Sequence, residues 1–325
     1  MVIDKTLVKR ILVITLSNVG DIVLTTPVIK ALAREYPSSR IDVMVGPNGK
    51  DIFDKDPRIF KLIIYDKHMP IVQKRRLQLK LKKLRYDLVV DLRNTIFPLL
   101  IGPRYRTATI EHFPQEMVHK KQRHLYRLSA LGVERRDEPS YVYVPDEDDA
   151  YARRLLEERG MREPMVIINP GAKSHLKRWA VEGFAEVCDR LNIECGLDVV
   201  FTGLAEDREV IEAVSRRMRR PHHMLTSLTN IRQLSALMKR AKLVLTNDSA
   251  PLHIGCAAGV KVLALFGPTD PKKYGPTGEF DMVISKPLSC APCESATCAH
   301  NLECMKLITP QEVFEAAKMM VEGYG

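Results

Sequence analysis

The amino-acid sequence predicts an α/β protein of two Rossmann-like domains, each built on a doubly wound parallel sheet. The 325 residues suffice for two domains, since a domain commonly takes roughly 100–200 residues. Hydrophobic residues make up 45% of the chain, enough for a sizeable core. Short apolar runs rich in β-branched residues alternate with segments of helical period almost throughout. This alternation is typical of parallel sheets covered by helices.

In the first half, continuous apolar runs predict strands buried on both faces, with amphipathic helices between them. The expected strands are Ile11–Leu16, Ile41–Val45, Leu62–Tyr65, Asp87–Leu92 and Thr107–Ile110, and the expected helices include Ile22–Glu35 and Ile71–Leu84.

The second half repeats the pattern, which is why a second domain is predicted. Its expected strands are Met165–Asn169, Asp198–Thr202, Leu243–Asn247 and Val262–Phe266. Its expected helices are Val181–Ile193, Asp207–Arg219, Ile231–Arg240 and Pro251–Ala258, followed by a last helix from Pro310 to about Val321.

The boundary is expected near residues 146–164. The acidic run at 146–149 opens a helix that ends at Gly160, and Pro164 precedes a new strand. Acids in a first helical turn suit the helix dipole, so this run is interpreted as structural. We therefore expect domains 1–160 and 161–325, with the terminal helix free to pack back on the first domain.

Charge is unevenly distributed between these halves. Residues 1–160 hold 30 Lys and Arg against 21 Asp and Glu, a net of +9, and residues 161–325 hold 20 against 19, a net of +1. The densest basic stretch, 67–85, contains Lys74, Arg75 and Arg76 and no acid. Two interpretations stay open: a solvated helix face, or a surface for an anionic partner. No nucleic-acid-binding motif favours nucleic acid.

No apolar run approaches the ~20 residues that span a bilayer, and no secretory signal is recognisable. We therefore expect a cytoplasmic protein whose cysteines are thiols rather than a disulfide framework.

Loops after strands carry the candidate site, because ligands of doubly wound sheets bind at the carboxyl ends of the strands. The first loop holds Asn18, Gly20 and Asp21 and lacks the Gly-x-Gly-x-x-Gly fingerprint of dinucleotide sites. Asp21 is either a helix N-cap or a carboxylate that takes a proton from an attacking hydroxyl.

The loops of the second half suit an anion. Small residues through Ala172, followed by Lys173 and Lys177, let backbone amides and ammonium groups face a phosphate. The loop that begins at Asp248 opens the helix of Pro251–Ala258, whose N-terminus favours negative charge. The alternative is that this loop only begins a helix and binds no anion. A weaker loop carries Glu206 and Asp207, which either hold ribose hydroxyls or cap a helix.

Taken together, these motifs resemble the lipopolysaccharide heptosyltransferases of glycosyltransferase family 9 over nearly the whole chain. They are Asn18-Val19-Gly20-Asp21 with Thr26-Pro27, Asn169-Pro170-Gly171-Ala172 with Lys177-Arg178-Trp179, Asn247 to His253, and Phe266-Gly267-Pro268-Thr269. The tail with Cys290-Ala291-Pro292-Cys293, Cys298 and Cys304-Met305 is also similar. Ser249-Ala250 stands where the family often has Thr-Gly. Residues 173–176 also depart from the family pattern, which leaves the sugar and the acceptor open.

The resemblance implies a GT-B fold, two Rossmann-like domains facing a cleft. It implies inverting transfer of heptose from ADP-heptose, without metal or cofactor, to an acidic glycolipid of the lipid A–Kdo type at the inner face of the inner membrane. By resemblance Asp21 is the catalytic base and Lys177 contacts the donor phosphates. Donor-site residues would be Ala172, Lys173, Glu206, Asp207, Thr229, Asp248, Ser249, Ala250 and His253. The acceptor is expected at Asn18 and Gly20 of the first loop and, from the charge of the basic stretch, at Lys74, Arg75 and Arg76.

Alternatives remain open. A nucleotide-sugar epimerase of the same fold would leave the basic surface unused, and a non-catalytic anion- or nucleic-acid-binding protein would show no turnover. The cysteine tail is either structural or a zinc site, since four thiolates make a tetrahedral shell. The wider second spacing, Cys298 to Cys304, weakens the zinc interpretation.

Overall fold

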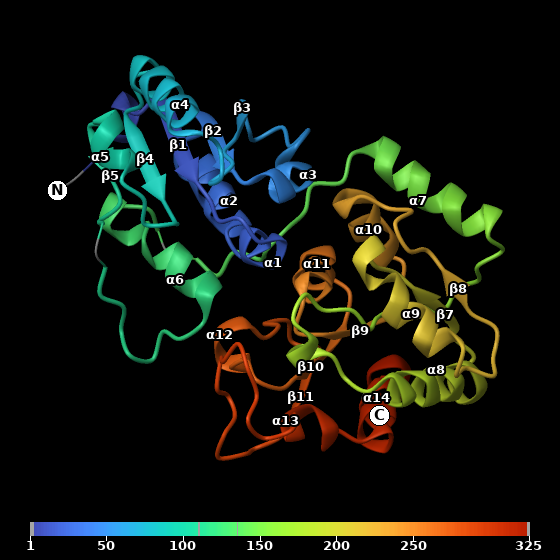
Figure 1. The fold of residues 1–325 in the computed structure, drawn as a ribbon. Coiled ribbons are helices and arrows are strands. Elements are labelled where there is room, and N and C mark those ends of the chain that lie inside the picture. Colours follow the sequence, from blue (N-terminus) through green and yellow to red (C-terminus); the bar gives the residue numbers. More distant parts are fainter. Residues whose placement is uncertain (1–2, 110, 135, 324–325) are drawn as a thin grey trace. The chain divides into compact units, whose positions relative to one another are not determined.

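A computed structural model describes residues 3–109, 111–134 and 136–323. The chain divides into two compact units, Met1–Tyr143 and Val144–Gly325, and each is an α/β sandwich around a parallel sheet (Figure 1). Within the described part of the chain, no helix has the length and apolarity to cross a membrane.

The first unit contains a five-stranded sheet of order β3-β2-β1-β4-β5, in which every pair is parallel. Its strands are β1 (Arg10–Ile14), β2 (Arg40–Val45), β3 (Lys61–Ile64), β4 (Leu88–Asp91) and β5 (Tyr105–Arg106). Its helices are α1 (Val19–Val23), α2 (Thr26–Glu35), α3 (Lys50–Phe53), α4 (Ile71–Lys83), α5 (Phe97–Ile101) and α6 (Lys120–Tyr126).

Two expectations for this unit were wrong in detail. The single helix expected over Ile22–Glu35 is broken, because the Thr25 and Thr26 hydroxyls donate to the carbonyls of Ile22 and Val23 and end α1. The fifth strand lies before Thr107 rather than after it, and the expected end at Ile110 lies outside the described residues. Thr107 instead accepts a hydrogen bond from the Asp91 amide at its hydroxyl, 2.9 Å away.

The second unit contains a six-stranded parallel sheet of order β11-β10-β9-β6-β7-β8. Its strands are β6 (Met165–Asn169), β7 (Asp198–Phe201), β8 (His223–Met224), β9 (Leu243–Asn247), β10 (Val262–Phe266) and β11 (Met282–Ser285). Its helices are α7 (Asp146–Glu158), α8 (Val181–Cys195), α9 (Arg208–Ser215), α10 (Ile231–Met238), α11 (Ala250–Ala258), α12 (Pro271–Tyr274), α13 (Glu303–Lys306) and α14 (Pro310–Glu322).

Helix α7 groups with the second unit, whereas the sequence analysis placed it in the first. Ion pairs made by its acidic first turn explain why α7 groups with the second unit. Asp148 is buried and its Oδ2 lies 2.5 Å from Arg232 Nε of α10, and Asp149 pairs with Arg240, 2.8 Å away. The acids therefore hold α7 on α10, a contact that a sequence pattern does not reveal.

The core of the second unit forms between the sheet and helices α8 and α14. Trp179 is buried against Phe184, with the ring centroids 5.0 Å apart. The apolar face of α14, which includes Phe314 and Met320, is buried in the same cluster, and α14 packs on α8. The last helix is thus anchored within its own unit.

Candidate functional site

The strand order of the second sheet reverses between β6 and β9. Strands β7 and β8 follow β6 on one side, and β10 and β11 follow β9 on the other. Loops after two such strands diverge and leave a crevice at the carboxyl edge of the sheet. The loop after β6 runs from Pro170 to Arg178, and the loop after β9 begins at Asp248. The sequence analysis placed its donor-site residues mainly on these two loops.

A buried asparagine joins the two loops. Asn247 Nδ2 donates to the Pro170 carbonyl at 2.8 Å, and Asn247 Oδ1 accepts from the Trp179 amide at 3.1 Å. At the end of β6, Asn169 Nδ2 donates to the Thr202 carbonyl and hydroxyl, 2.7 Å from each. These fixed amides hold both ends of the β6 loop, so the crevice is preorganised. The sequence analysis quoted both asparagines in its motifs but gave neither a role.

Lys177 and Asp248 form an ion pair that joins the loop after β6 to the loop after β9. Lys177 Nζ donates to Asp248 Oδ2 at 2.5 Å; the aspartate side chain is 7% exposed and the lysine side chain 32% exposed. An ammonium group has three donors, so Lys177 can hold Asp248 and still reach an anion at the mouth of the crevice. Arg178 Nε caps the same loop by donating to the Ala172 carbonyl at 2.9 Å, while Lys173 is exposed.

The N-terminus of α11 opens into the same edge of the sheet. Ser249 is the N-cap residue in an extended conformation, and its hydroxyl makes no capping bond but lies 3.3 Å from Thr246 Oγ1. Ala250 is the first helical residue and Pro251 follows it. Amides of a first helical turn have no partner within the helix, and with the dipole they favour an anion. His253 is buried one turn further along.

The loop after β7 interlocks with the loop after β6. Asp207 Oδ2 accepts from the Leu204 amide at 3.0 Å, and a Cβ added to Gly171 would lie 2.1 Å from Asp207 Oδ1. A side chain at position 171 would therefore require the Asp207 carboxylate to move. Glu206 is exposed beside it, and Thr229 is half-buried just before α10. The ribose and adenine roles predicted for these residues stay predictions.

In the first unit, Asp21 lies on α1 at the carboxyl end of β1. The N-cap of α1 is Asn18, so the interpretation of Asp21 as that cap was wrong. Asn18 Nδ2 donates to Asp21 Oδ2 at 3.0 Å, and no other hydrogen bond to this carboxylate occurs in the described residues. Asp21 is half-buried, and Gly20 precedes it on α1. A carboxylate held this way keeps lone pairs available to accept a proton.

A second group of polar residues lies where β4 ends. Strand β4 is the neighbour of β1, and the strand order of the first sheet reverses between these two strands. Arg127 is buried, and its Nη1 donates to the Asp91 carbonyl at 2.9 Å and to Asn94 Oδ1 at 2.6 Å. Its Nε lies 3.2 Å from Glu111, whose pKa is raised by burial. This group was not predicted, although Arg93 and Asn94, directly after the predicted strand Asp87–Leu92, were a usable signal.

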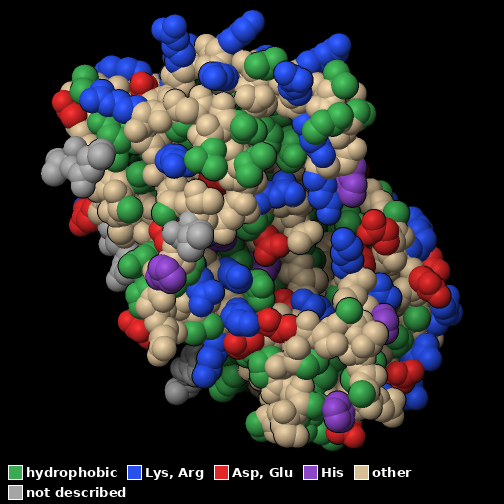
Figure 2. Space-filling model, turned by 60° about the vertical axis from the view of Figure 1, so that its left-hand side comes forward, with side chains coloured by type: hydrophobic (Ala, Val, Ile, Leu, Met, Phe, Trp, Pro, Cys, Tyr) green, Lys and Arg blue, Asp and Glu red, His purple; other side chains and the backbone are tan. Residues whose placement is uncertain are grey.

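Lys74, Arg75 and Arg76 lie on α4, a different element from Asn18 and Gly20. Lys74 Nζ donates to the Lys67 carbonyl at 2.7 Å, and Arg75 and Arg76 are exposed. The top of Figure 2, at the height of α4 in Figure 1, shows Lys and Arg side chains with few acids between them.

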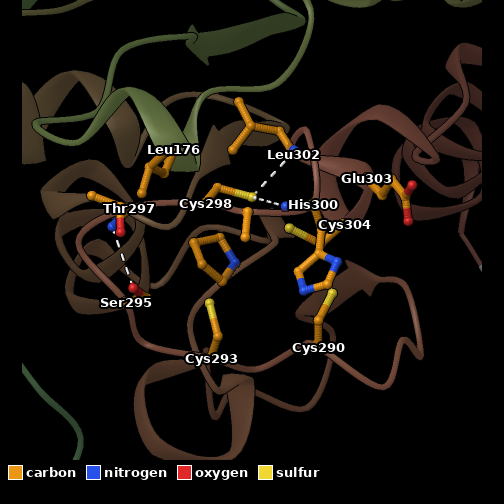
Figure 3. Close-up of a pocket in the computed structure, with 12 residues that line it drawn as sticks. Leu176, Cys290, Cys293, Ser295, Thr297, Cys298, His300, Leu302, Glu303 and Cys304 are labelled. Atoms are coloured by element: carbon orange, nitrogen blue, oxygen red, sulfur yellow. Dashed lines mark hydrogen bonds between the residues drawn. The ribbon is translucent and has the colours of Figure 1, made fainter.

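The cysteine tail surrounds a pocket of about 320 Å³ in the second unit (Figure 3). All seven cysteines of the chain are free thiols, as predicted. Cys298 Sγ accepts hydrogen bonds from the amides of His300 and Leu302, at 3.4 and 3.3 Å. Burial, reinforced by Cys298, Cys290 and Cys293, raises the pKa of the Cys304 thiol. Across residues 3–109, 111–134 and 136–323, no three His, Cys, Asp or Glu side chains are arranged to hold a metal ion.

Comparisons with known proteins agree with this fold. Residues 102–303, more than half of the chain, match the family described as Glycosyltransferase family 9 (heptosyltransferase). Lipopolysaccharide heptosyltransferase 3 of Escherichia coli strain K12 is 31% identical over 277 residues, which cover 77% of this chain and 80% of that protein.

Two solved structures are similar over their whole length. A family 9 glycosyl transferase from Veillonella parvula superposes with a TM-score of 0.84 at 24% identity, covering 97% of each chain. ADP-heptose LPS heptosyltransferase II of E. coli gives 0.78 at 24% identity, covering 96% of this chain and 98% of that one. The predicted GT-B fold is thereby confirmed. Asp21 precedes the residues that match the family, so its predicted role rests on the residues around it.

Proposed function

This chain belongs to glycosyltransferase family 9, and from that premise we propose that it transfers a heptose from ADP-heptose to the inner core of lipopolysaccharide. Its relatives are lipopolysaccharide heptosyltransferases, which supports the sugar and the acceptor. The observation that carries the proposal is the meeting of the loops after β6 and β9 at the carboxyl edge of the second sheet. There Lys177 and the N-terminus of α11 offer two kinds of positive charge to one diphosphate.

The proposed reaction is a single displacement with inversion. The acceptor hydroxyl attacks the anomeric carbon, its proton passes to Asp21, and the bond from that carbon to the ADP oxygen breaks. Negative charge grows on the departing diphosphate, where Lys177 and the α11 amides stabilise it. Asp248 holds the Lys177 ammonium in place before the donor arrives. The donor belongs to the second unit and the acceptor to the first.

Lysine and helix dipole supply the charge that a metal ion would otherwise supply, so the proposed mechanism uses no metal or cofactor. Treatment with EDTA followed by desalting should leave the transfer rate unchanged. A rate that falls on chelation and returns with magnesium would remove this part of the proposal.

The proposed acceptor is an acidic glycolipid of the lipid A–Kdo type, and the proposed location is the cytoplasmic face of the inner membrane, where the protein binds peripherally. The excess of cations over acids in the first unit supports an anionic acceptor. No nucleic-acid partner is proposed.

Incubation with ADP-heptose and heptose-deficient lipopolysaccharide, followed by mass spectrometry of both, tests the function. We expect a glycolipid one heptose heavier and an equal amount of ADP. Isomerised sugar nucleotide with unchanged lipid would indicate an epimerase instead. An unchanged donor at saturating concentrations of both substrates would indicate a binding protein.

A further inference from the structure

The exposed face of α4 carries cations and aliphatic side chains together. Positions 72, 75, 76, 79, 82 and 83 are spaced so that they share one side of a helix, and all six are exposed. Val72 and Leu79 lie along the middle of this side, 58% and 49% exposed. The opposite side of α4, with Leu77 and Leu81, packs into the core of the first unit. Val72 and Leu79 therefore contribute nothing to that core.

The cations of this face have no acidic neighbours. Neither an aspartate nor a glutamate occurs between residues 67 and 85. None of the α4 lysines and arginines forms an ion pair with a described residue. In the arginine-rich segment that follows α9, by contrast, Arg216 pairs with Glu212 and Arg217 with Glu182. The charge of α4 thus stays uncompensated within the chain.

Helix α5 extends the apolar part of this surface. It packs against α4, and Gln78 Nε2 donates to the Leu100 carbonyl at 3.3 Å. Ile96, just before α5, is 65% exposed, and Leu99 and Leu100 are 55% and 42% exposed. Figure 1 shows α4 and the short helix α5 next to each other at one end of the first unit. Five exposed aliphatic side chains thus lie on two adjoining elements.

We propose that α4 and α5 form a docking surface for an anionic lipid bilayer, with these aliphatic side chains inserted at the boundary between headgroups and acyl chains. A helix of this kind lies in the plane of the interface, with cations on the headgroup phosphates and apolar side chains beneath them. The inference rests on the proposed glycolipid acceptor, which is embedded in such a bilayer. It goes further because insertion predicts a binding contribution that salt does not remove.

The composition of the face favours lipid over nucleic acid. Proteins that bind single strands without sequence preference stack bases on aromatic side chains, and α4 contains no aromatic residue. Aliphatic side chains between the cations would have no partner on a phosphate backbone. On a bilayer they leave water, which is favourable in proportion to the apolar area removed.

Sedimentation of the full-length protein with vesicles of phosphatidylcholine and phosphatidylglycerol tests the surface. The double variant Val72→Ser/Leu79→Ser is compared with a matched control in the second unit, Ile193→Ser/Leu307→Ser, whose residues are 56% and 48% exposed. We expect the α4 variant to bind vesicles about tenfold more weakly and the control to bind like the wild type. At high salt the wild type should still exceed the α4 variant.

Equal vesicle binding by wild type and α4 variant would overturn the insertion, as would wild-type binding that high salt abolishes completely. Preference for single-stranded RNA over vesicles of equal charge would overturn the lipid partner. Circular dichroism of both variants should match the wild type, because neither removes a core contact. Heptose transfer to a delipidated acceptor separates the two proposals. If the wild type does not transfer heptose to this acceptor, the proposed function fails, regardless of the vesicle-binding result. If both variants retain this transfer while only the α4 variant loses vesicle binding, the docking surface is supported.

Discussion

The two units share one architecture and differ in how they treat charge. Divided at Tyr143, the first unit holds 27 Lys and Arg against 15 Asp and Glu, a net of +12, and the second holds 23 against 25, a net of −2. Where the strand order reverses in the second unit, the buried amide of Asn247 and the Lys177–Asp248 ion pair join the loops after β6 and β9. At the corresponding place in the first unit lies the half-buried carboxylate of Asp21. The second unit thus carries the proposed donor site, and the first carries a basic helix and, on a different element, the candidate base.

The largest expected effect concerns the candidate base. Asp21→Asn keeps the size of the side chain and an acceptor for Asn18, but removes its proton affinity. Turnover should fall by about 10²–10⁴-fold, while ADP affinity stays at the wild-type value because the proposed donor site lies in the other unit. Initial rates and ADP calorimetry on the same preparation measure both. Wild-type turnover in this variant would leave Asp21 without a catalytic role.

The second-largest effect is expected at Lys177, the proposed contact of the donor phosphates. Lys177→Ala should weaken ADP binding by about 10–100-fold, because a hydrogen bond to a charged group contributes about 1.5–3 kcal/mol. Lys242→Ala is the matched control, since Lys242 is exposed at the amino-terminal end of β9, the opposite edge of the same sheet. If both variants bind ADP equally well, the diphosphate does not lie beside Lys177.

A buried histidine, His124, should make the stability of the first unit depend on pH. Burial, reinforced by Arg127, lowers the pKa of His124 to about 3, and its Nδ1 has no hydrogen-bond partner in the described structure. Its unfolded pKa is about 6.5, so below that pH the unfolded chain takes up a proton that the folded chain refuses. Stability should therefore fall as the pH drops from 6.5 towards 3, by about 1.4 kcal/mol per pH unit from this group.

His124→Gln should remove that contribution. Urea unfolding at pH 6.5, 5.5 and 4.5 measures it as a shallower pH slope in the variant, whatever its stability at pH 6.5. Parallel slopes in the two proteins would mean that His124 ionises freely in the folded chain.

The smallest effect is expected on the basic helix. Neutralising Lys74, Arg75 and Arg76 to Gln should raise the acceptor KM by about three- to tenfold, since each surface charge contributes about 0.2–0.5 kcal/mol, the lower part of the range for exposed ion pairs. The increase should shrink with added salt, because exposed charges more than about 8–10 Å apart are screened. ADP affinity should not change. Unaltered acceptor kinetics at low ionic strength would return this patch to a solvated helix face.

Several elements could be predicted with their bounds, and the reason is burial. β6, β9 and β10 are uninterrupted apolar runs covered on both faces, and the structure has them where the sequence analysis did. Edge strands β8 and β11 are short and only half-buried, so their sequences show no comparable run. Prediction failed where long-range contacts decide the outcome, as in the assignment of α7 to the wrong domain.

The candidate site shows the same limit. Its loops could be placed from the sequence, because a strand followed by small residues and a helix start is a local pattern. The pairing of Lys177 with Asp248 and the bridge made by Asn247 join residues far apart in the chain. Only the strand order that brings β6 beside β9 unites them, and no local pattern specifies that order.

A crystal structure with ADP bound tests the central claim most directly, namely that the change of strand order in the second unit is the donor site. The account predicts the diphosphate within hydrogen-bond distance of Lys177 Nζ and of the first amides of α11. A diphosphate bound to the first unit, or to the cysteine pocket, with the crevice between β6 and β9 unoccupied, would contradict it.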